Sequence, residues 1–386
     1  MSRVAKDEPH IFLVAGEVSG DVIGALLMRA LRAARPQVSF AGVGGDAMAR
    51  EGLASLFPLS DIAVMGLAPL RRLPQLRARI VRAAQAIVDA APDCLVIIDA
   101  PDFTHRVARR VRRARPDIPI IDYVSPTVWA WRPGRARAMR AYVDLVLAVL
   151  PFEPAAHERL GGPPCAYVGH PLVEYLDRLT PDAGEQAARD AKPPLLLVLP
   201  GSRHAEVARL MPVFGETIAL LSWLCGPFDV ALPVVPHVEQ EVRAHLRSWP
   251  IQPRLVAQDE KFAAFRRARA ALVASGAATL ELALAGVPMA VAYKVSPMEA
   301  LLKFLVTVDS IVLPNLVLGE KFVPEFLQQE ATPQALAASL APLVTGSGAR
   351  EAQRAGFAQV RARILSAGAH PSACAAAHVL DAISRR

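Results

Sequence analysis

Short apolar runs alternate with longer stretches of helical periodicity along nearly the whole chain. The runs are continuous rather than interleaved with polar residues, a pattern typical of parallel strands that helices cover on both faces. A first series of predicted strands spans Ile11–Ala15, Val38–Val43, Cys94–Ile98, Ile118–Tyr123, Leu145–Leu150 and Cys165–Val168. A second series spans Leu195–Leu199, Phe228–Val235, Arg254–Ala257, Ala271–Ala274 and Met289–Tyr293. The helical patterns between them include Asp21–Ala34, Pro74–Ala90 and Thr279–Ala285. The sequence therefore predicts an α/β protein with two doubly wound sheets.

The break between the two series falls near Gly169-His170-Pro171, ahead of a polar stretch, residues 180–194, with little apolar periodicity. We therefore expect one Rossmann-like domain over residues 1–169 and a second over residues 170–345, facing each other across a cleft. The remaining residues, 346–386, are Ala-rich and helical in pattern. We expect this tail to pack back on a Rossmann-like domain.

The composition narrows the class of protein. With 386 residues, 53% hydrophobic and 20% charged, the chain is neither disordered nor a small disulfide scaffold. Its four cysteines are far apart and form no C-x-x-C pair, which fits a reducing compartment and argues against a zinc knuckle. No apolar run approaches the roughly 18 residues of a membrane span, and the start of the chain does not read as a signal peptide. These features indicate a cytoplasmic protein.

Positive charge is concentrated in the first half of the chain. The net charge is +7, and residues 1–170 hold 22 basic and 16 acidic side chains, or +6. Three arginine clusters without intervening acids lie at residues 71–82, 106–115 and 132–140. One interpretation is a bias of base composition in the genome. The other is that the first domain meets something anionic, such as phosphate groups, nucleic acid or acidic lipid headgroups.

In the first domain, candidate chemistry follows two predicted strands. The segment Gly16 to Asp21 forms a strand-to-helix turn, whose helix start offers unpaired N–H groups to a ligand. It lacks the G-x-G-x-x-G spacing, so no dinucleotide fingerprint is present, and an ordinary turn with Ser19 or Asp21 as the helix N-cap is the simpler interpretation. Asp99, directly after a buried run, is a candidate general base at a sheet edge. The structural alternative is that an aspartate here caps the next helix, and this role suits Asp102 better than Asp99.

An aromatic and basic segment follows the fourth predicted strand. Trp129 and Trp131 lie beside Arg132, in a loop or at a helix start. Tryptophan rings there could stack on a sugar or rest in a lipid interface, and plain core packing is the simpler alternative.

In the second domain, two turns of the same kind suit a diphosphate. Gly201, Ser202 and Arg203 stand between a strand and a helix, and Arg203 offers a fork of donors for phosphate. Ser275 and Gly276 repeat that arrangement, with Glu281 near enough to reach a ribose hydroxyl. Two such helix starts could hold a pyrophosphate between them. The segment from Leu313 to Lys321 reads as a loop. Metal-binding motifs such as H-E-x-x-H are absent, so we expect no metal and no cofactor.

Together these segments resemble the lipid-A-disaccharide synthase family, glycosyltransferases of the two-Rossmann B-type fold. The resemblance rests on AGEVSGD (residues 15–21), IDAPDF (98–103), YVSPTVWAWR (123–132), LPFE (150–153), VGHPLVE (168–174), LPGSRHAEV (199–207), SGAATLELAL (275–284) and LPNLVLGEKFVPEFLQ (313–328). The blocks occur in the family's order. Two positions depart from the family: Ala277 where threonine is usual, and Leu318 where a small residue is usual.

The resemblance implies an inverting transfer of a glycosyl unit from UDP-diacyl-glucosamine to the 6-hydroxyl of diacyl-glucosamine 1-phosphate (lipid X). It implies Asp99 as the general base and Arg203, with the backbone of Gly201 and Ser202, as the group that neutralises the departing diphosphate. Further donor contacts implied are Glu281, Ser275, Gly276, Thr279 and Asn315. Acceptor contacts implied are Glu17, Ser19, Gly20 and Asp21.

Both substrates carry acyl chains, so we expect the enzyme to work on an anionic membrane, at the inner face of the inner membrane, as a peripheral protein. The segment Val64 to Leu73 joins apolar side chains to arginines and is the expected contact. A homodimer is a further expectation. Two alternatives stay open: a UDP-sugar epimerase of the same architecture, and a basic nucleic-acid-binding module. No recognised nucleic-acid motif appears, so we expect no nucleic-acid partner.

Overall fold

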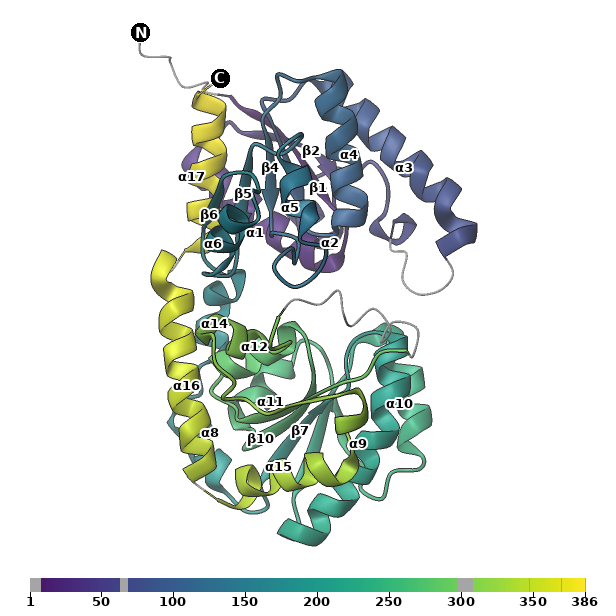
Figure 1. Ribbon diagram of the computed structural model, residues 1–386, viewed down its shortest axis with the longest axis vertical. Coiled ribbons are helices and arrows are strands. Elements are labelled where there is room, and N and C mark those ends of the chain that lie inside the picture. Colours follow the sequence, from purple (N-terminus) through teal and green to yellow (C-terminus); the bar gives the residue numbers. More distant parts are fainter. Residues whose placement is uncertain (1–7, 63–68, 297–307, 347, 369, 386) are drawn as a thin grey trace. The chain divides into compact units, whose positions relative to one another are not determined.

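The computed structural model describes residues 8–62, 69–296, 308–346, 348–368 and 370–385 (Figure 1). The chain forms two compact units. Unit 1 is Met1–Val173 together with Leu365–Arg386, and unit 2 is Glu174–Ile364. The C-terminal segment that the sequence suggested as one tail is therefore divided between the units. Its first helix belongs to unit 2 and its last helix to unit 1.

Unit 1 is built on a parallel six-stranded sheet with the strand order β2-β1-β3-β4-β5-β6. The strands are β1 (His10–Ala15), β2 (Ser39–Val43), β3 (Cys94–Ile98), β4 (Ile120–Tyr123), β5 (Leu145–Ala148) and β6 (Cys165–Tyr167). The helices are α1 (Val18–Ala34), α2 (Asp46–Arg50), α3 (Pro69–Ala90), α4 (Pro101–Ala114), α5 (Gly134–Met139), α6 (Glu153–Arg159) and α17 (Pro371–Ser384). All six predicted strands of the first series are present, and their pairing confirms a doubly wound parallel sheet.

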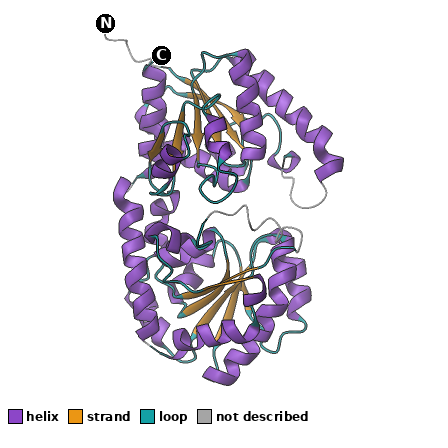
Figure 2. Cartoon of the chain, viewed as in Figure 1, coloured by secondary structure: helices purple, strands orange, loops and turns teal. Residues whose placement is uncertain are grey.

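Helices cover both faces of the unit 1 sheet, as Figure 2 shows. On one face Phe12, Val14, Leu95 and Ile97 pack with apolar residues of α3 and α4. On the other face α1 and α17 lie against each other and both contact β3. Successive residues of β3 thus face opposite helix layers, and all five are buried. This explains the unbroken apolar run in the sequence.

Unit 2 repeats the plan with the strand order β12-β11-β10-β7-β8-β9, again all parallel. The strands are β7 (Leu195–Leu199), β8 (Asp229–Pro233), β9 (Arg254–Val256), β10 (Ala270–Ala274), β11 (Met289–Tyr293) and β12 (Glu325–Leu327). The helices are α7 (Leu176–Leu179), α8 (Ala183–Asp190), α9 (His204–Cys225), α10 (Glu239–Leu246), α11 (Lys261–Arg267), α12 (Ala277–Leu284), α14 (Leu313–Leu318), α15 (Pro333–Thr345) and α16 (Gly348–Ile364). The short edge strand β12 was not predicted.

The core of unit 2 explains one property of α9. This helix is long and apolar enough to cross a membrane by length and composition, and among the described residues it is the helix that meets that test. Its apolar side chains Val207, Leu210, Met211 and Phe214 are buried against the sheet and α15. The apolar length of α9 is accounted for by its place as the central core helix of unit 2.

Two expectations concern segments that are not described or that fold differently. The membrane-contact segment 64–73 lies outside the described residues, apart from the backbone of its last residues at the start of α3. The segment from Leu313, expected to be a loop, begins instead with the helix α14. Pro314 sits in its first turn, where a proline needs no N–H partner, and Gly319 ends the helix with φ of 75°.

Candidate active site

In unit 1, Asp99 lies where β3 ends, and two neighbouring elements hold it there. The hydroxyl of Ser19, in the first turn of α1, donates to Oδ2 of Asp99 at 2.6 Å. The other carboxylate oxygen, Oδ1, accepts from the backbone N–H of Ala100 at 2.7 Å. The backbone N–H of Asp99 donates to the carbonyl of Tyr123 at the end of β4. The carboxylate is thus held by α1 and by the turn after β3, the backbone of Asp99 is held by β4, and the residue stays half-buried.

The backbone at this point is strained. Asp99 and Ala100 have φ of 56° and 45°, and Val124, at the end of the next strand, has φ of 77°. Residues with a Cβ rarely adopt these angles, and a β-branched valine least of all. Such conformations persist where the surrounding structure enforces them, and they cluster at functional sites. The expected base therefore sits in a turn whose shape the fold maintains against a conformational cost.

Two glycines let α1 approach this turn. A Cβ on Gly16 would lie 2.3 Å from the Cβ of Ala100, and a Cβ on Gly20 would lie 2.9 Å from the carbonyl oxygen of Ile98. Only glycine permits such contacts, so Gly20 acts in the structure by bringing the first turn of α1 onto the end of β3. This close approach is what places Ser19 within reach of Asp99.

The carboxylates at either side of Ser19 differ in their surroundings. Glu17 is the N-cap residue of α1, without a side-chain cap bond, and it is exposed. Asp21 is only 3% exposed and accepts from the backbone N–H groups of Gly45, Ala47 and Met48 at 2.7–3.0 Å. Asp21 therefore binds the start of α2. The expectation that Ser19 or Asp21 caps α1 is wrong: the N-cap residue is Glu17, the Ser19 hydroxyl binds Asp99, and the Asp21 carboxylate binds the start of α2.

The segment after β4 is anchored by a buried carboxylate. Trp129 Nε1 donates to Oε1 of Glu153 at 3.1 Å, and Oε2 of Glu153 accepts from the N–H groups of Val149 and Leu150. Burial raises the pKa of Glu153 to about 7, and the three donors act against that rise. Ser125 is hydrogen-bonded to the buried His157 at 2.8 Å. The motifs around Trp129 and Glu153 are thus joined by buried hydrogen bonds, and we call Trp129, Glu153, Ser125 and His157 the Glu153 cluster. Core packing was therefore the better interpretation for Trp129.

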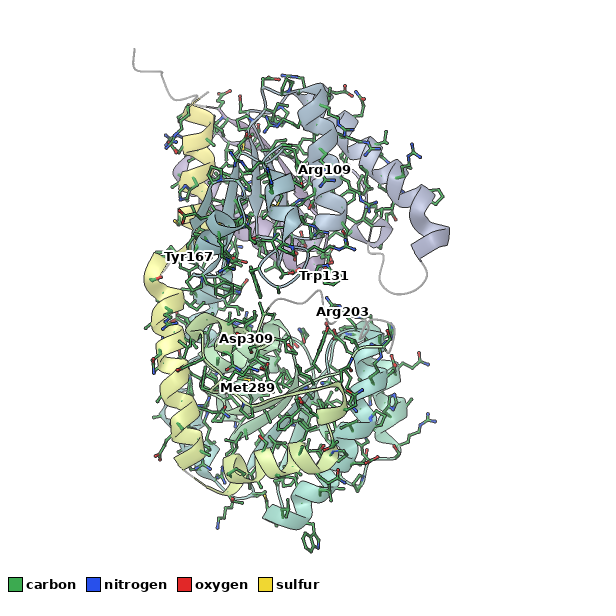
Figure 3. The ribbon with its side chains drawn as sticks, viewed as in Figure 1. Arg109, Trp131, Tyr167, Arg203, Met289 and Asp309 are labelled. Carbon is green, nitrogen blue, oxygen red and sulfur yellow. The ribbon has the colours of Figure 1, made fainter. Side chains whose placement is uncertain are left out.

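Trp131, which Figure 3 labels, comes next in the same loop and is followed by Arg132. The guanidinium carbon of Arg132 lies 5.2 Å from the centre of the Trp131 ring, a cation–π contact. Asp102, expected to cap α4, is instead 80% exposed in its side chain and pairs with Arg135 at 3.3 Å. The N-cap residue of α4 is Ala100. Asp102 is therefore a surface residue of α4.

In unit 2, the turn after β7 presents Arg203 at the start of α9 (Figure 3). The Arg203 side chain is 57% exposed, and its Nη1 pairs with Oε1 of Glu206 at 2.9 Å. Gly201 has φ of 106°, which a glycine adopts without strain. The carbonyl of Ser202 accepts from Nε2 of His237 at 2.7 Å. The turn therefore presents an exposed cation at the positive end of a long helix.

The turn after β10 is the second predicted helix start. Gly276 is exposed with φ of 150°, and a Cβ built there would meet no atom within 4 Å. The hydroxyls of this turn serve the fold: Ser275 Oγ donates to the carbonyl of Ile311, and the buried Thr279 Oγ1 donates to the carbonyl of Gly276. Glu281 accepts two bonds from Nζ of Lys261, at 2.9 and 3.0 Å. Backbone at Gly276 is what this turn offers to a ligand.

Asn315, expected near the donor, is 1% exposed. Its Nδ2 donates to the carbonyl of Val323 at 2.9 Å, and its Oδ1 accepts from the N–H groups of Phe322 and Val323. Both ends of the carboxamide are thus bound to the segment after α14. Asn315 shapes that segment rather than presenting its side chain to a ligand.

A pocket of about 380 Å³ in unit 2 was not predicted from the sequence. It is lined by Arg209, Lys294, Val295, Gln328 and Gln329, which follow β11 and β12 or lie on α9. Gln328 has φ of 53°, and its Oε1 accepts from the N–H of Val295 at 3.1 Å. The available signal was weak, since two glutamines after an unpredicted three-residue strand form no motif. Within the described residues, no group of three or more His, Cys, Asp or Glu side chains is placed to hold a metal ion.

Comparisons with known proteins agree with this architecture. The family model described as Lipid-A-disaccharide synthetase matches residues 11–379. A lipid-A-disaccharide synthase of Nitrobacter hamburgensis is 54% identical over 382 residues, covering 98% of this chain and 96% of that protein. Another, from Rhodopseudomonas palustris strain BisB18, is 55% identical over 375 residues, covering 96% and 94%.

Solved structures share the fold at low identity. MurG of Acinetobacter baumannii has a TM-score of 0.55 at 14% identity, covering 98% of this chain and all of that one. The UDP-GlcNAc 2-epimerase of Neisseria meningitidis, solved bound to UDP-GlcNAc, has a TM-score of 0.59 at 12% identity, covering 92% and 99%. The epimerase alternative thus shares the fold alone, whereas the synthases share half of their sequence. The chain belongs to the lipid-A-disaccharide synthase family, and it is a glycosyltransferase of lipid A biosynthesis with the B-type fold.

Proposed function

We propose that this enzyme transfers the glycosyl unit of UDP-diacyl-glucosamine to the 6-hydroxyl of lipid X, with inversion and release of UDP. The product is the β(1→6)-linked disaccharide 1-phosphate. The observation that carries the proposal is Asp99, held by Ser19 and by the backbone of Ala100 at the end of β3. A carboxylate so fixed can take a proton from a sugar hydroxyl.

The transfer is a single displacement at the anomeric carbon. Asp99 accepts the proton of the 6-hydroxyl as that oxygen bonds to the anomeric carbon. The bond from that carbon to the diphosphate oxygen breaks, and UDP leaves with the electron pair. One displacement on the face opposite the leaving group inverts the configuration. Ser19 orients the carboxylate through its bond to Oδ2.

The donor diphosphate is bound by unit 2 in this proposal. Arg203 supplies charge-assisted hydrogen bonds, while the N–H groups at Gly201, Ser202 and Gly276 and the starts of α9 and α12 supply partial positive charge. Charge on the leaving oxygen grows during the reaction, so these groups stabilise the transition state more than the bound donor. The shared fold with an epimerase solved bound to UDP-GlcNAc supports a UDP-sugar as the donor.

The remaining site residues fall into two groups, those proposed to contact a ligand and those whose side chains are bound within the fold. Glu17, exposed at the start of α1, is proposed to contact the acceptor, and Glu281 the ribose with Lys261 as its partner. We propose that the others act by shaping the turns that carry the ligands: Gly20, Asp21, Ser275, Thr279 and Asn315.

Peripheral attachment to an anionic inner-membrane surface, from the cytoplasmic side, is part of the proposal. It is supported by the acyl chains of both proposed substrates and by the +6 charge of residues 1–170. A homodimer is proposed as well, and light scattering on the purified protein tests it.

The deciding experiment is incubation of the purified enzyme with UDP-diacyl-glucosamine and lipid X, followed by mass spectrometry. We expect a disaccharide 1-phosphate and an equal amount of UDP. Epimerised UDP-sugar without disaccharide would contradict the proposal. The anomeric configuration of the product, measured by proton NMR, tests inversion separately.

A further inference from the structure

Glu206 occupies the inner side of the turn that the proposed function assigns to the diphosphate. Its Oε1 accepts from Nη1 of Arg203 at 2.9 Å, and its Oε2 accepts from the backbone N–H of Ser202 at 3.3 Å. A Cβ placed on Gly201 would lie 2.4 Å from the same Oε2. The carboxylate thus fills the space left by Gly201 and uses two donors that a phosphate oxygen would use.

This arrangement differs from an ordinary helix cap. In a capping box, the glutamate at the third helical position reaches back to the N–H of the N-cap residue. Here the N-cap residue is Arg203, and Glu206 passes it to reach the N–H of Ser202, one residue earlier. It also binds the cation of the turn. The first turn of α9 favours a negative charge at this place, and the carboxylate supplies one.

The ion pair is weak enough to exchange. The Arg203 side chain is 57% exposed and that of Glu206 is 16% exposed, and ion pairs open to water contribute little. A diphosphate offers Arg203 more negative charge and more acceptor oxygens than one carboxylate does. It would therefore displace Glu206 from Arg203 and Ser202, while the displaced carboxylate, tethered in the same helical turn, remains close.

We propose that Glu206 is a built-in competitor of the donor diphosphate: it holds the turn open in the diphosphate-binding shape and, by like charge, speeds the release of UDP. This inference rests on the proposed function, since it needs the diphosphate to bind at Arg203. Glu206 acts through Arg203 and the turn, so it is a positioning residue.

The test is titration of the full-length enzyme with UDP by calorimetry, with Glu206→Gln against wild type. Glutamine keeps an acceptor for the Ser202 N–H and removes the charge. We expect the Kd for UDP to fall about 3- to 10-fold, a gain that shrinks in high salt because exposed charges are screened. Product inhibition by UDP should strengthen by the same factor, and KM for the donor should fall while kcat does not rise.

Glu239→Gln is the matched control. Glu239 pairs with Arg243 on the surface of α10 in the same unit, and its change alters the net charge equally. Unchanged or weaker UDP binding by Glu206→Gln, relative to Glu239→Gln, overturns the inference and leaves the donor site standing. Absence of UDP binding by wild type overturns both. If Glu206→Gln does not fold, Glu206→Asp withdraws the charge from the turn, and it too should bind UDP more tightly.

Discussion

The carboxyl edges of the two sheets differ in how they hold their polar groups. At the edge of unit 1, Asp99 and Asp21 are held by several bonds each, and residues with side chains are forced into left-handed backbone. At the edge of unit 2, the corresponding turns use glycine, an exposed arginine and backbone N–H groups. A proton acceptor needs a fixed position, whereas a site that must bind and release a charged leaving group benefits from exposed, weakly paired charge. The comparison predicts the largest effect on turnover at Asp99 of the first edge, whereas substitutions at the second edge act on the binding and departure of the donor diphosphate.

The largest effect is expected at Asp99. Asp99→Asn keeps the acceptor for the Ala100 N–H and tolerates the left-handed backbone, but it cannot take a proton. We expect kcat to fall about 10²- to 10⁴-fold, with the melting temperature and UDP affinity nearly unchanged. Asp102→Asn, a change of equal size at a surface position, should leave kcat within about twofold. A fully active Asp99→Asn would contradict the role of Asp99 as the general base and make Glu17 the next residue to test.

The buried Glu153 cluster of unit 1 should make the free energy of unfolding depend on pH. The pKa of Glu153 rises from 4.5 to about 7 on folding because of burial. A group that binds its proton more tightly when folded stabilises the fold fully below its unfolded pKa. That stability is lost as pH rises from about 4.5 to about 7, roughly 3 kcal/mol in total.

Denaturant titrations of wild type and Glu153→Gln between pH 5 and pH 8 measure this. Because the amide does not titrate, the difference in unfolding free energy between the two proteins should change in that window. Parallel pH profiles for the two proteins would show that Glu153 keeps an ordinary affinity for its proton.

At the edge of unit 2, Arg203→Ala should cost about 1.5–3 kcal/mol of transition-state stabilisation, seen as a lower kcat/KM for the donor. Arg203→Lys keeps the charge without the fork of donors and should recover only part of the loss. Acceptor KM serves as the internal control, because it should not change. An acceptor effect larger than the donor effect would place the two substrates differently from the proposal.

The smallest effect separates two neighbouring carboxylates of α1. Asp21→Asn loses an acceptor for one of three backbone N–H groups and should lower the unfolding free energy by about 1–2 kcal/mol, with acceptor KM unchanged. Glu17→Gln should do the opposite, raising acceptor KM without a change in stability. Equal changes in unfolding free energy and in acceptor KM for the two variants would mean that burial does not separate a structural role of Asp21 from an acceptor-binding role of Glu17.

The positions of the strand ends could be predicted from the sequence, and the partners of their side chains could not. Continuous apolar runs locate buried parallel strands, and β3 and β7 begin and end where the pattern places them. Parallel pairing then brings the residues that follow each strand to one edge. The strand β12 was not predicted because its three residues are only half-buried and one of them is Glu325, so they form no apolar run.

Side-chain roles depend on contacts between distant segments. Asp21 binds residues 45–48, Ser275 binds Ile311, and Glu281 binds Lys261. Each pairing arises from how helices pack on the sheet, and no local spacing encodes it. Motif similarity predicted a set of site residues, and the structure is needed to separate the exposed ones from those whose side chains hold a turn.

The return of the chain to unit 1 has a consequence for synthesis on the ribosome. The sheet of unit 1 is complete at β6, yet α17, which covers α1 and contacts β3, is made only after all of unit 2. Its residues Pro371, Ala375, Ala376 and Val379 are buried, so α1 has an uncovered apolar face until they leave the exit tunnel. Unit 2, uninterrupted in sequence from Glu174 to Ile364, is fully translated before that moment. Unit 1, whose sheet is made before unit 2, is therefore completed only after unit 2, and a nascent chain truncated before α17 carries a complete unit 2 and an unfinished unit 1.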